Sequence, residues 1–186
     1  MRLMMTKRSL VSVIILIAFV AIECGTAHNM SCENISTANE SNPSGRFDQA
    51  GALFNMSRLN ESISAYDRAI ELNQSYVEAW DHKGDTLRKM GKYNEAIAAY
   101  NIAIKLDPTR GDSWYNEGVA LFDQGRYNES ITAYDRAIDL NPEWTLPWYG
   151  KGESLDQSGL HEDALEAYDK AVELDLTSAK QNKKII

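Results

Sequence analysis

Histidine and cysteine are scarce in this sequence, and no spacing joins them in a catalytic or metal-binding motif. The three histidines, His28, His82 and His161, do not follow the short intervals at which two histidines on one helix bind a metal ion. The sequence has no glycine-rich phosphate loop, and Glu162 and Asp163 stand at a predicted helix start, where acids complement the helix dipole. We therefore expect no enzyme activity, no catalytic residue, no cofactor and no metal site.

The amino terminus has the pattern of an export signal. Three basic residues precede an apolar run at residues 10–22, which is shorter than the ~20 residues of a membrane-spanning helix. Small residues at Gly25 and Ala27 fit a cleavage site after Ala27. The sequence thus predicts a signal peptide at residues 1–27. An uncleaved membrane anchor at residues 10–22, a lipid attached to Cys24 and a buried core helix are the alternatives.

Charge and cysteine content limit the classes of partner and the cellular compartments that are expected for this chain. Cleavage after Ala27 would remove three of the 19 basic and one of the 27 acidic residues, leaving 16 and 26 and a net charge of −10. Such a chain lacks the clustered cations that neutralise phosphates, so we expect no nucleic-acid partner. Only Cys32 would remain, which excludes an internal disulfide. We expect an extracellular or cell-envelope protein that contacts a membrane only through an uncleaved amino-terminal segment.

Residues 28–42 form a polar segment with no hydrophobic period, which is typical of a disordered linker. Three N-glycosylation sequons in it, at Asn29, Asn34 and Asn39, are the candidate glycosylation sites. Asn60 and Asn128 occupy the same place in an internal repeat, where asparagine also serves as a helix N-cap. Further sequons begin at Asn55, Asn60, Asn73 and Asn128.

The decisive pattern is a repeat of 34 residues. Trp80, Trp114 and Trp148 are 34 residues apart. Three further positions of the first helix, occupied by Gly, Leu and Gly, recur with the same period. In the second helix an Ala-Tyr pair recurs, and an alanine follows three residues after the tyrosine. These are Gly84, Gly118 and Gly152; Leu87, Leu121 and Leu155; Gly91, Gly125 and Gly159; Ala65-Tyr66, Ala99-Tyr100, Ala133-Tyr134 and Ala167-Tyr168; and Ala69, Ala103, Ala137 and Ala171.

This pattern resembles the tetratricopeptide repeat (TPR) family, whose 34-residue unit carries Trp, Gly, Leu, Ala, Tyr, Ala and Pro at fixed offsets. The resemblance implies an all-α, right-handed α-solenoid of about four helix-turn-helix units. The units are residues 43–76, which match weakly, then 77–110, 111–144 and 145–178, followed by a short basic tail at 179–186.

The repeat positions have a physical meaning that needs no family name. An apolar stripe such as Trp80, Gly84 and Leu87 ends at Gly91, which can adopt positive φ and stop the first helix. After a two-residue turn, Asn94 or Asn128 is expected to cap the second helix, and Pro108 or Pro142 to end it. Each unit is therefore an antiparallel pair, and the tryptophans are expected to pack between successive units.

The two ends depart from the pattern. The first unit has Arg46 at the tryptophan position and Ser57 at the turn glycine. The last unit has Leu176 in place of the proline, so its second helix is expected to continue through Ala179 to Lys184. Too few residues follow for a separate capping helix, and an exposed apolar edge there could support self-association into a homo-oligomer.

The TPR resemblance also implies a concave surface lined by the first helix of each unit. Its acids indicate a groove for a peptide or protein with basic and apolar residues, although the same charges would also keep the chain soluble. Asp81 and Asp85 stand where a groove for terminal carboxylates would need basic or amide residues, which excludes that ligand. The partner-binding candidates are Glu78, Asp81, Asp85, Arg88, Asp112, Tyr115, Val119, Phe122, Tyr149, Glu153 and Asp156, with Ser44, Phe47, Gly51, Phe54 and Leu146 at the equivalent places.

Together these observations predict a non-catalytic protein-interaction scaffold. A structural solenoid that assembles end to end and an accessory subunit that positions a catalytic partner are the alternatives.

Overall fold

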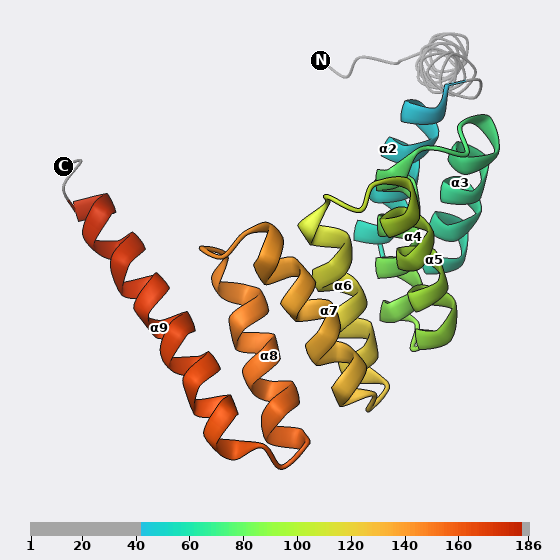
Figure 1. The fold of residues 1–186 in the computed structure, drawn as a ribbon. Helices are drawn as coiled ribbons and strands as arrows, with labels where there is room; N and C mark the ends of the chain where they lie inside the picture. Colours follow the sequence, from blue (N-terminus) through green and yellow to red (C-terminus); the bar gives the residue numbers. More distant parts are fainter. Residues whose placement is uncertain (1–41, 184–186) are drawn as a thin grey trace, which may run out of the picture.

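The computed structural model describes residues 42–183, with side chains as far as Thr177. The expected signal peptide, the linker and the candidate sites Asn29, Asn34 and Asn39 lie outside the described residues. Within them the chain forms eight helices and no strand, arranged as four antiparallel pairs in a row (Figure 1). The helices are α2 (Pro43–Asn55), α3 (Leu59–Leu72), α4 (Val77–Lys89), α5 (Tyr93–Leu106), α6 (Gly111–Asp123), α7 (Tyr127–Leu140), α8 (Thr145–Gln157) and α9 (His161–Lys183).

The order of packing follows the order of the chain. We call α2, α4, α6 and α8 the A helices and α3, α5, α7 and α9 the B helices. Each A helix packs against the B helix of its own pair, and the B helices α3, α5 and α7 pack against the next A helix. The A helices begin at residues 43, 77, 111 and 145, which is one start every 34 residues. The predicted all-α fold of helix pairs is confirmed.

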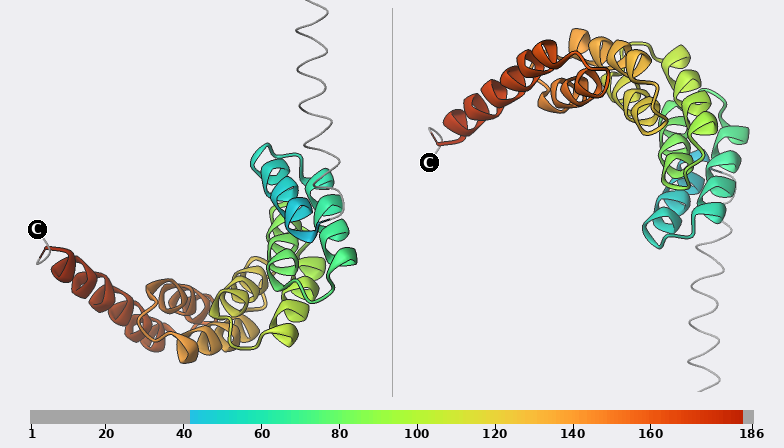
Figure 2. Two further views of the ribbon diagram at one scale, coloured as in Figure 1. Left: turned by 90° about the horizontal axis from the view of Figure 1, so that it is seen from above. Right: turned by 90° about the horizontal axis from the view of Figure 1, so that it is seen from below.

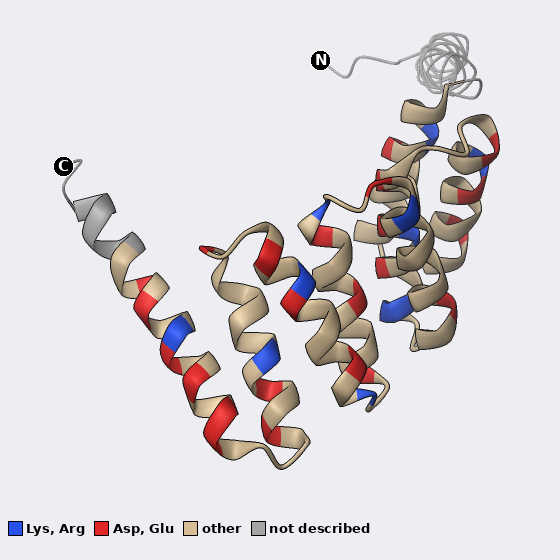
Figure 3. Ribbon diagram, viewed as in Figure 1, with Lys and Arg blue, Asp and Glu red and all other residues tan. Residues whose placement is uncertain are grey.

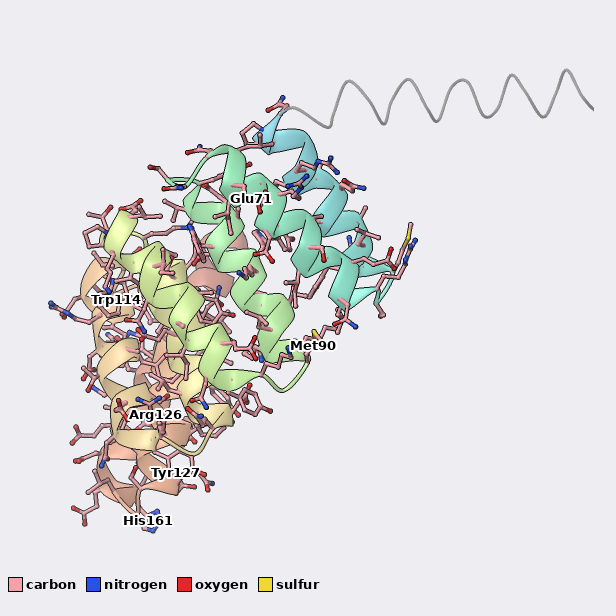
Figure 4. All side chains as sticks on the ribbon, turned by 90° about the vertical axis from the view of Figure 1, so that its right-hand side faces the viewer. Glu71, Met90, Trp114, Arg126, Tyr127 and His161 are labelled. Atoms are coloured by element: carbon pink, nitrogen blue, oxygen red, sulfur yellow. The ribbon has the colours of Figure 1, made fainter. Side chains whose placement is uncertain are left out.

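Every A helix ends in the same tight turn. Gly91, Gly125 and Gly159 have φ of 75°, 81° and 81°, the left-handed region that glycine adopts without a steric penalty. The amide of the following residue then donates to a carbonyl five residues back, as Lys92 N does to Leu87 O at 3.0 Å. These turns lie along one edge of the row, marked by Met90, Arg126 and His161 in Figure 4.

The predicted asparagine caps of the B helices are wrong. Helices α5 and α7 begin at Tyr93 and Tyr127, so Asn94 and Asn128 are second helical residues, and neither helix has a side-chain cap. The cause is the brevity of the turn, because only one residue separates the glycine from the helix. Asn94 instead accepts a hydrogen bond from Gln124 of the next pair, with Nε2 2.7 Å from Oδ1. It therefore links two units rather than capping one helix.

The core is a series of seams between neighbouring helices rather than one centre. Buried alanine and tyrosine side chains of the B helices meet small residues of the A helices. The closest approaches involve tyrosine rings and glycine backbones: a Cβ atom on Gly84 would lie 2.5 Å from Tyr100 Cε1. The buried side chains at the repeated B-helix positions are Ala65, Tyr66, Ala69, Ala99, Tyr100, Ala103, Ala133, Tyr134, Ala137, Ala167 and Ala171.

The repeated tryptophans hold the connections between pairs. Trp80, Trp114 and Trp148 are half-buried at the seams. The indole N–H of each donates to the backbone carbonyl six residues earlier, at 3.2, 3.1 and 3.0 Å respectively. Each ring therefore packs as the spacing predicted and also fixes the turn that leads into its own helix.

The last B helix is the exception to the period. Helices α5 and α7 end at Leu106 and Leu140, two residues before a proline. Helix α9 has Leu176 at that position and runs without a break to Lys183. No described helix folds back against it, and it projects from the end of the row in Figure 1.

The first turn is the strained copy of the repeat. Ser57 has φ of 59° where the later turns have glycine. A left-handed conformation costs an L-residue about 1–2 kcal/mol, part of which glycine loses again in backbone entropy. We expect Ser57→Gly to raise the free energy of unfolding by about 0.5–1 kcal/mol. Urea unfolding should show this, with Gly125→Ser as the reverse change. The protein must be unglycosylated, because Ser57 completes the Asn55 sequon. Equal stability of Ser57→Gly and wild type would contradict it.

Candidate binding surfaces

The row of helices is curved, and the A helices line its inner side. Consecutive A helices touch one another at α2–α4, α4–α6 and α6–α8, whereas among the described residues consecutive B helices do not. The two views in Figure 2 show the resulting arc. The predicted groove residues all belong to the A helices, and those that are exposed are therefore expected on the inner surface.

Asp81, one of the predicted groove residues, is not on the exposed surface. It is 4% exposed, inside the seam between α4 and α6. Arg110 lies beside it, with Nε 3.0 Å from Asp81 Oδ2, and Ser113 Oγ donates to the same oxygen at 2.9 Å. Burial raises the pKa of the Asp81 carboxyl to about 6, while the hydroxyl and the guanidinium act in the opposite direction. This carboxylate therefore lies within the α4–α6 seam and is not part of the exposed inner surface.

Arg110 also joins Glu78 to the same seam. Its Nη1 lies 2.6 Å from Glu78 Oε1. The Glu78 side chain is 44% exposed, and backbone hydrogen bonding together with Arg110 lowers the pKa of its carboxyl. Glu78 therefore lies at the edge of the inner surface with its charge already compensated.

Two further charged residues of α4 are held by neighbouring side chains. The Tyr100 hydroxyl donates to Asp85 Oδ1 at 2.7 Å, and burial raises the pKa of that tyrosine far above its usual value. Arg88 Nη1 donates to Asp123 Oδ2 of α6 at 3.1 Å. The predicted acidic cluster on α4 is thus largely engaged within the fold.

The aromatic residues of α6 are half-buried rather than free. The Tyr115 ring lies 5.8 Å from that of Tyr134 and 4.9 Å from that of Trp144. Phe122 packs against Tyr127 at 5.5 Å. Val119 of the same helix is half-buried as well.

The most accessible predicted residues lie on α6 and α8. Asp112 is exposed and Glu153 is half-buried, and neither has an ion-pair or hydrogen-bond partner within residues 42–177. Burial raises the pKa of the Glu153 carboxyl. Burial also raises the pKa of Tyr115, to which the charge of Glu153 adds a smaller contribution. Tyr149 is 52% exposed, and Asp156 contacts His161 at 2.7 Å. The free inner surface is thus smaller than the sequence predicted and shifted toward α6 and α8.

Sequence reasoning missed the last residue of each unit. Tyr76, Arg110 and Trp144 lie opposite the fifth residue of the same unit, which is Phe47, Asp81 and Tyr115 respectively. The seam between the first and second units and the seam between the third and fourth units therefore each contain two aromatic rings. The seam between the second and third units contains an ion pair. The signal was present in the sequence, because the two positions change together from one unit to the next.

Charges of both signs occur on the remaining surface, with acids in excess (Figure 3). Asn55, Asn60, Asn73 and Asn128, which begin the four sequons inside the described range, are all exposed. Among residues 42–183 no three His, Cys, Asp or Glu side chains come together as a metal site. No helix in the same range is long and apolar enough to cross a membrane.

Solved structures share this fold. A crystal structure of MamA aligns with a TM-score of 0.74 at 22% identity, over 80% of this chain and 86% of that one. MamA from Desulfovibrio magneticus gives 0.69 at 22% identity, over 74% and 78%. At this identity the likeness concerns the fold alone. No curated protein matches the chain in sequence.

Sequence profiles of known families agree with the spacing. Tetratricopeptide repeat profiles match residues 45–76, 65–98, 82–143 and 147–178, which together include residues from all four helix pairs and cover more than half of the chain. The chain belongs to the tetratricopeptide repeat family.

Proposed function

We propose that this chain is a non-catalytic scaffold that binds a peptide or protein segment along its inner surface. One observation carries the proposal: on α6 and α8 the carboxylates of Asp112 and Glu153, which have no partner among the described residues, accompany the half-buried Tyr115 and the exposed Tyr149. TPR folds typically serve in protein–protein interaction and are usually non-catalytic, which supports the same conclusion.

The chemistry of this surface favours a basic segment with large apolar side chains. Unpaired carboxylates attract lysine and arginine, and this attraction weakens as salt screens it. Aromatic rings with one buried side and one exposed edge can seat an apolar side chain at little cost in side-chain entropy. A ligand of this kind would use both features together.

A charge-reversal pair tests the proposal. The probe is a library of 12-residue peptides rich in Lys, Arg and aromatic residues, measured by fluorescence anisotropy. We expect Asp112→Lys with Glu153→Lys to weaken binding of the selected peptides at least tenfold. The control is Glu71→Lys with Asp139→Lys, which makes the same charge change at B-helix carboxylates that are 62% and 67% exposed. If both pairs weaken binding equally, the attraction is that of net charge and the groove is not a site.

We also propose that the domain works outside the cytoplasmic membrane, either secreted or held by residues 10–22. The support is the basic leader, the apolar run and the abundance of sequons, four of them at exposed positions. Intact mass of the natively expressed protein tests both points. Loss of residues 1–27 together with glycan mass is the expected result for a secreted form. Glycan mass on a full-length chain would indicate the anchored form, and a full-length, unglycosylated chain would contradict both cleavage and glycosylation.

A further inference from the structure

The end of the row formed by α8 and α9 exposes a surface that every other unit buries. Tyr134 and Ile138 of α7 are 3% and 8% exposed because α8 covers them. Val172, the counterpart of Ile138, is 57% exposed, and Tyr168, the counterpart of Tyr134, is only half-buried. We call this the terminal face; it consists of Leu165, Tyr168, Asp169 and Val172 of α9 with Leu146 and Tyr149 of α8.

The terminal face is hollowed as well as apolar. A depression of about 550 Å³ lies between α8 and α9, with Leu146 and Tyr149 on one side and Tyr168 and Val172 on the other. Leu146, Tyr149, Leu165 and Val172 are each more than half exposed. Apolar side chains gathered in this way indicate a surface that another molecule covers.

The interior seams show which side chains of a following A helix pack against the equivalent surface of a B helix. Gly150 of α8 faces Tyr134 so closely that a Cβ atom there would lie 2.6 Å from the ring. The next residue, Lys151, places Nζ 2.7 Å from Asp135 Oδ1 of α7. An earlier seam repeats the ion pair, because Lys83 Nζ lies 2.6 Å from Asp67 Oδ1. Two of the three seams thus place a lysine against this carboxylate. The residue before the lysine is Gly150 in one seam and His82, which stacks on Tyr66, in the other.

The terminal face has the same aspartate and tyrosine positions as the interior seams, but no described lysine or aromatic residue of a following unit packs against them. Asp169 occupies the position of Asp67 and Asp135, and it is exposed with no ion-pair partner within residues 42–177. Tyr149 occupies the position of Tyr115, whose ring packs against Trp144 at 4.9 Å. Its only described ring neighbour is Tyr168 of its own pair, at 5.5 Å.

We propose that the terminal face binds an amphipathic α-helix of a separate partner protein. That helix presents a small residue to Tyr168, a lysine or arginine immediately after it to Asp169, and an aromatic residue six positions earlier to Tyr149. This order is the one that Trp144, Gly150 and Lys151 follow over α7. The binding mode is a helix laid into an apolar groove, with the ion pair setting its register.

A second copy of the chain fits the face less well. Among the described residues α2 is the A helix that no unit precedes, and head-to-tail stacking would place it on α9. It carries Asp48 at the position of Gly150 and Gln49 at that of Lys151. Stacking would therefore bring the Asp48 carboxylate to Tyr168 beside Asp169, and like charges at close range oppose association. The cation of α2 is Arg46, which donates to Gln49 Oε1 at 3.1 Å and stands in place of a tryptophan rather than of Lys151.

The test uses the purified full chain and a defined helical probe. The probe is a helix-stapled, fluorescently labelled peptide with the sequence of residues 144–160, which covers the equivalent face of α7. We expect wild-type protein to bind it in anisotropy titrations, and the peptide with Lys151→Glu to bind at least tenfold more weakly. Asp169→Lys in the protein should then restore binding of the Lys151→Glu peptide. Equal binding of both peptides to wild-type protein, or no restoration by the charge swap, would overturn the proposal.

Surface variants distinguish this face from the inner groove and from self-association. Val172→Asp should abolish peptide binding, while Leu72→Asp, at a side chain 47% exposed on α3, and Asp112→Lys, on α6, should leave it unchanged. Circular dichroism should show the same helix content in all of them, since each position is exposed. If sedimentation instead shows a wild-type dimer that Val172→Asp makes monomeric, a second copy covers the face and the proposal is wrong.

Discussion

Replacing Arg110 with alanine is expected to destabilise the protein by about 3 kcal/mol. The reason is the carboxylate that it leaves behind, because Asp81 is 4% exposed and would lose its only described cation. Breaking a buried pair costs about 3–5 kcal/mol, and the lower figure applies because the Arg110 side chain is itself 26% exposed. Urea denaturation followed by circular dichroism would measure the loss.

The repeat supplies the matched control. The equivalent seam of the next unit holds Tyr115 and Trp144, so Asp81→Tyr with Arg110→Trp copies a pair that this chain already packs. Ser113→Ala completes the change, since that hydroxyl would otherwise lose its acceptor. We expect this triple variant to recover most of the loss, because an apolar pair avoids the desolvation of two charges. A loss below about 1 kcal/mol in Arg110→Ala would show that the guanidinium does not compensate Asp81.

The same carboxylate makes stability depend on pH. The pKa of Asp81 is raised to about 6 in the folded chain, against about 3.9 in an unfolded one. Between these values the folded state holds a proton that the unfolded state has released, so the contribution of Asp81 falls as pH rises and is constant above about 6. We expect the difference in unfolding free energy between wild type and Asp81→Asn to decrease from pH 4 to pH 6. A difference that rises over that interval would contradict the raised pKa.

Tyr134→Ala is expected to cost about 4 kcal/mol, because this ring joins three helices. It is 3% exposed and fills the space between Gly118 of α6 and Gly150 of α8, where Cβ atoms would lie 2.7 and 2.6 Å from it. Removing it opens a cavity at the seam that couples the last pair to the rest of the row. In a repeat protein stability depends on such nearest-neighbour seams, so we expect α8 and α9 to unfold before the remaining pairs. Hydrogen exchange resolved by segment would measure this separation.

Tyr168→Ala is the control at the equivalent position. Tyr168 also faces a glycine of its own pair, Gly152, but within the described residues no further helix covers its other side. We expect a loss well below that of Tyr134→Ala, since the ring fills only half of the corresponding space. Equal losses in the two variants would show that Tyr134 acts only within its own pair and contributes nothing to the seam.

Features that depend on one repeat unit could be predicted from the sequence. The 34-residue period fixed the helix starts, and the turn glycines indicated where the A helices end, because both follow from local backbone geometry and a regular apolar stripe. The proline rule worked in the same way for α5, α7 and the uninterrupted α9. The predicted asparagine caps failed because sequence spacing does not reveal how many residues a tight turn occupies.

Features that depend on two units were harder to predict. Position within the unit placed Asp81 on the inner surface, and nothing in that position alone indicated that Arg110 would draw it into a seam. Asp85 and Arg88 likewise look like free charges until Tyr100 and Asp123 are seen beside them. A surface of a repeat protein can be predicted from its period, but the free charges on it are known only when neighbouring units are compared pair by pair.

The indole hydrogen bonds of Trp80, Trp114 and Trp148 give the row a built-in set of optical probes. Each ring is half-buried at a different seam and bonded to the turn that precedes its helix. Opening of one seam exposes one indole and frees its N–H. A chain that keeps a single tryptophan of the three, with phenylalanine at the other two and at Trp144, would report by its emission on one joint at a time. Unfolding of the row could then be followed as a sequence of separate fluorescence changes.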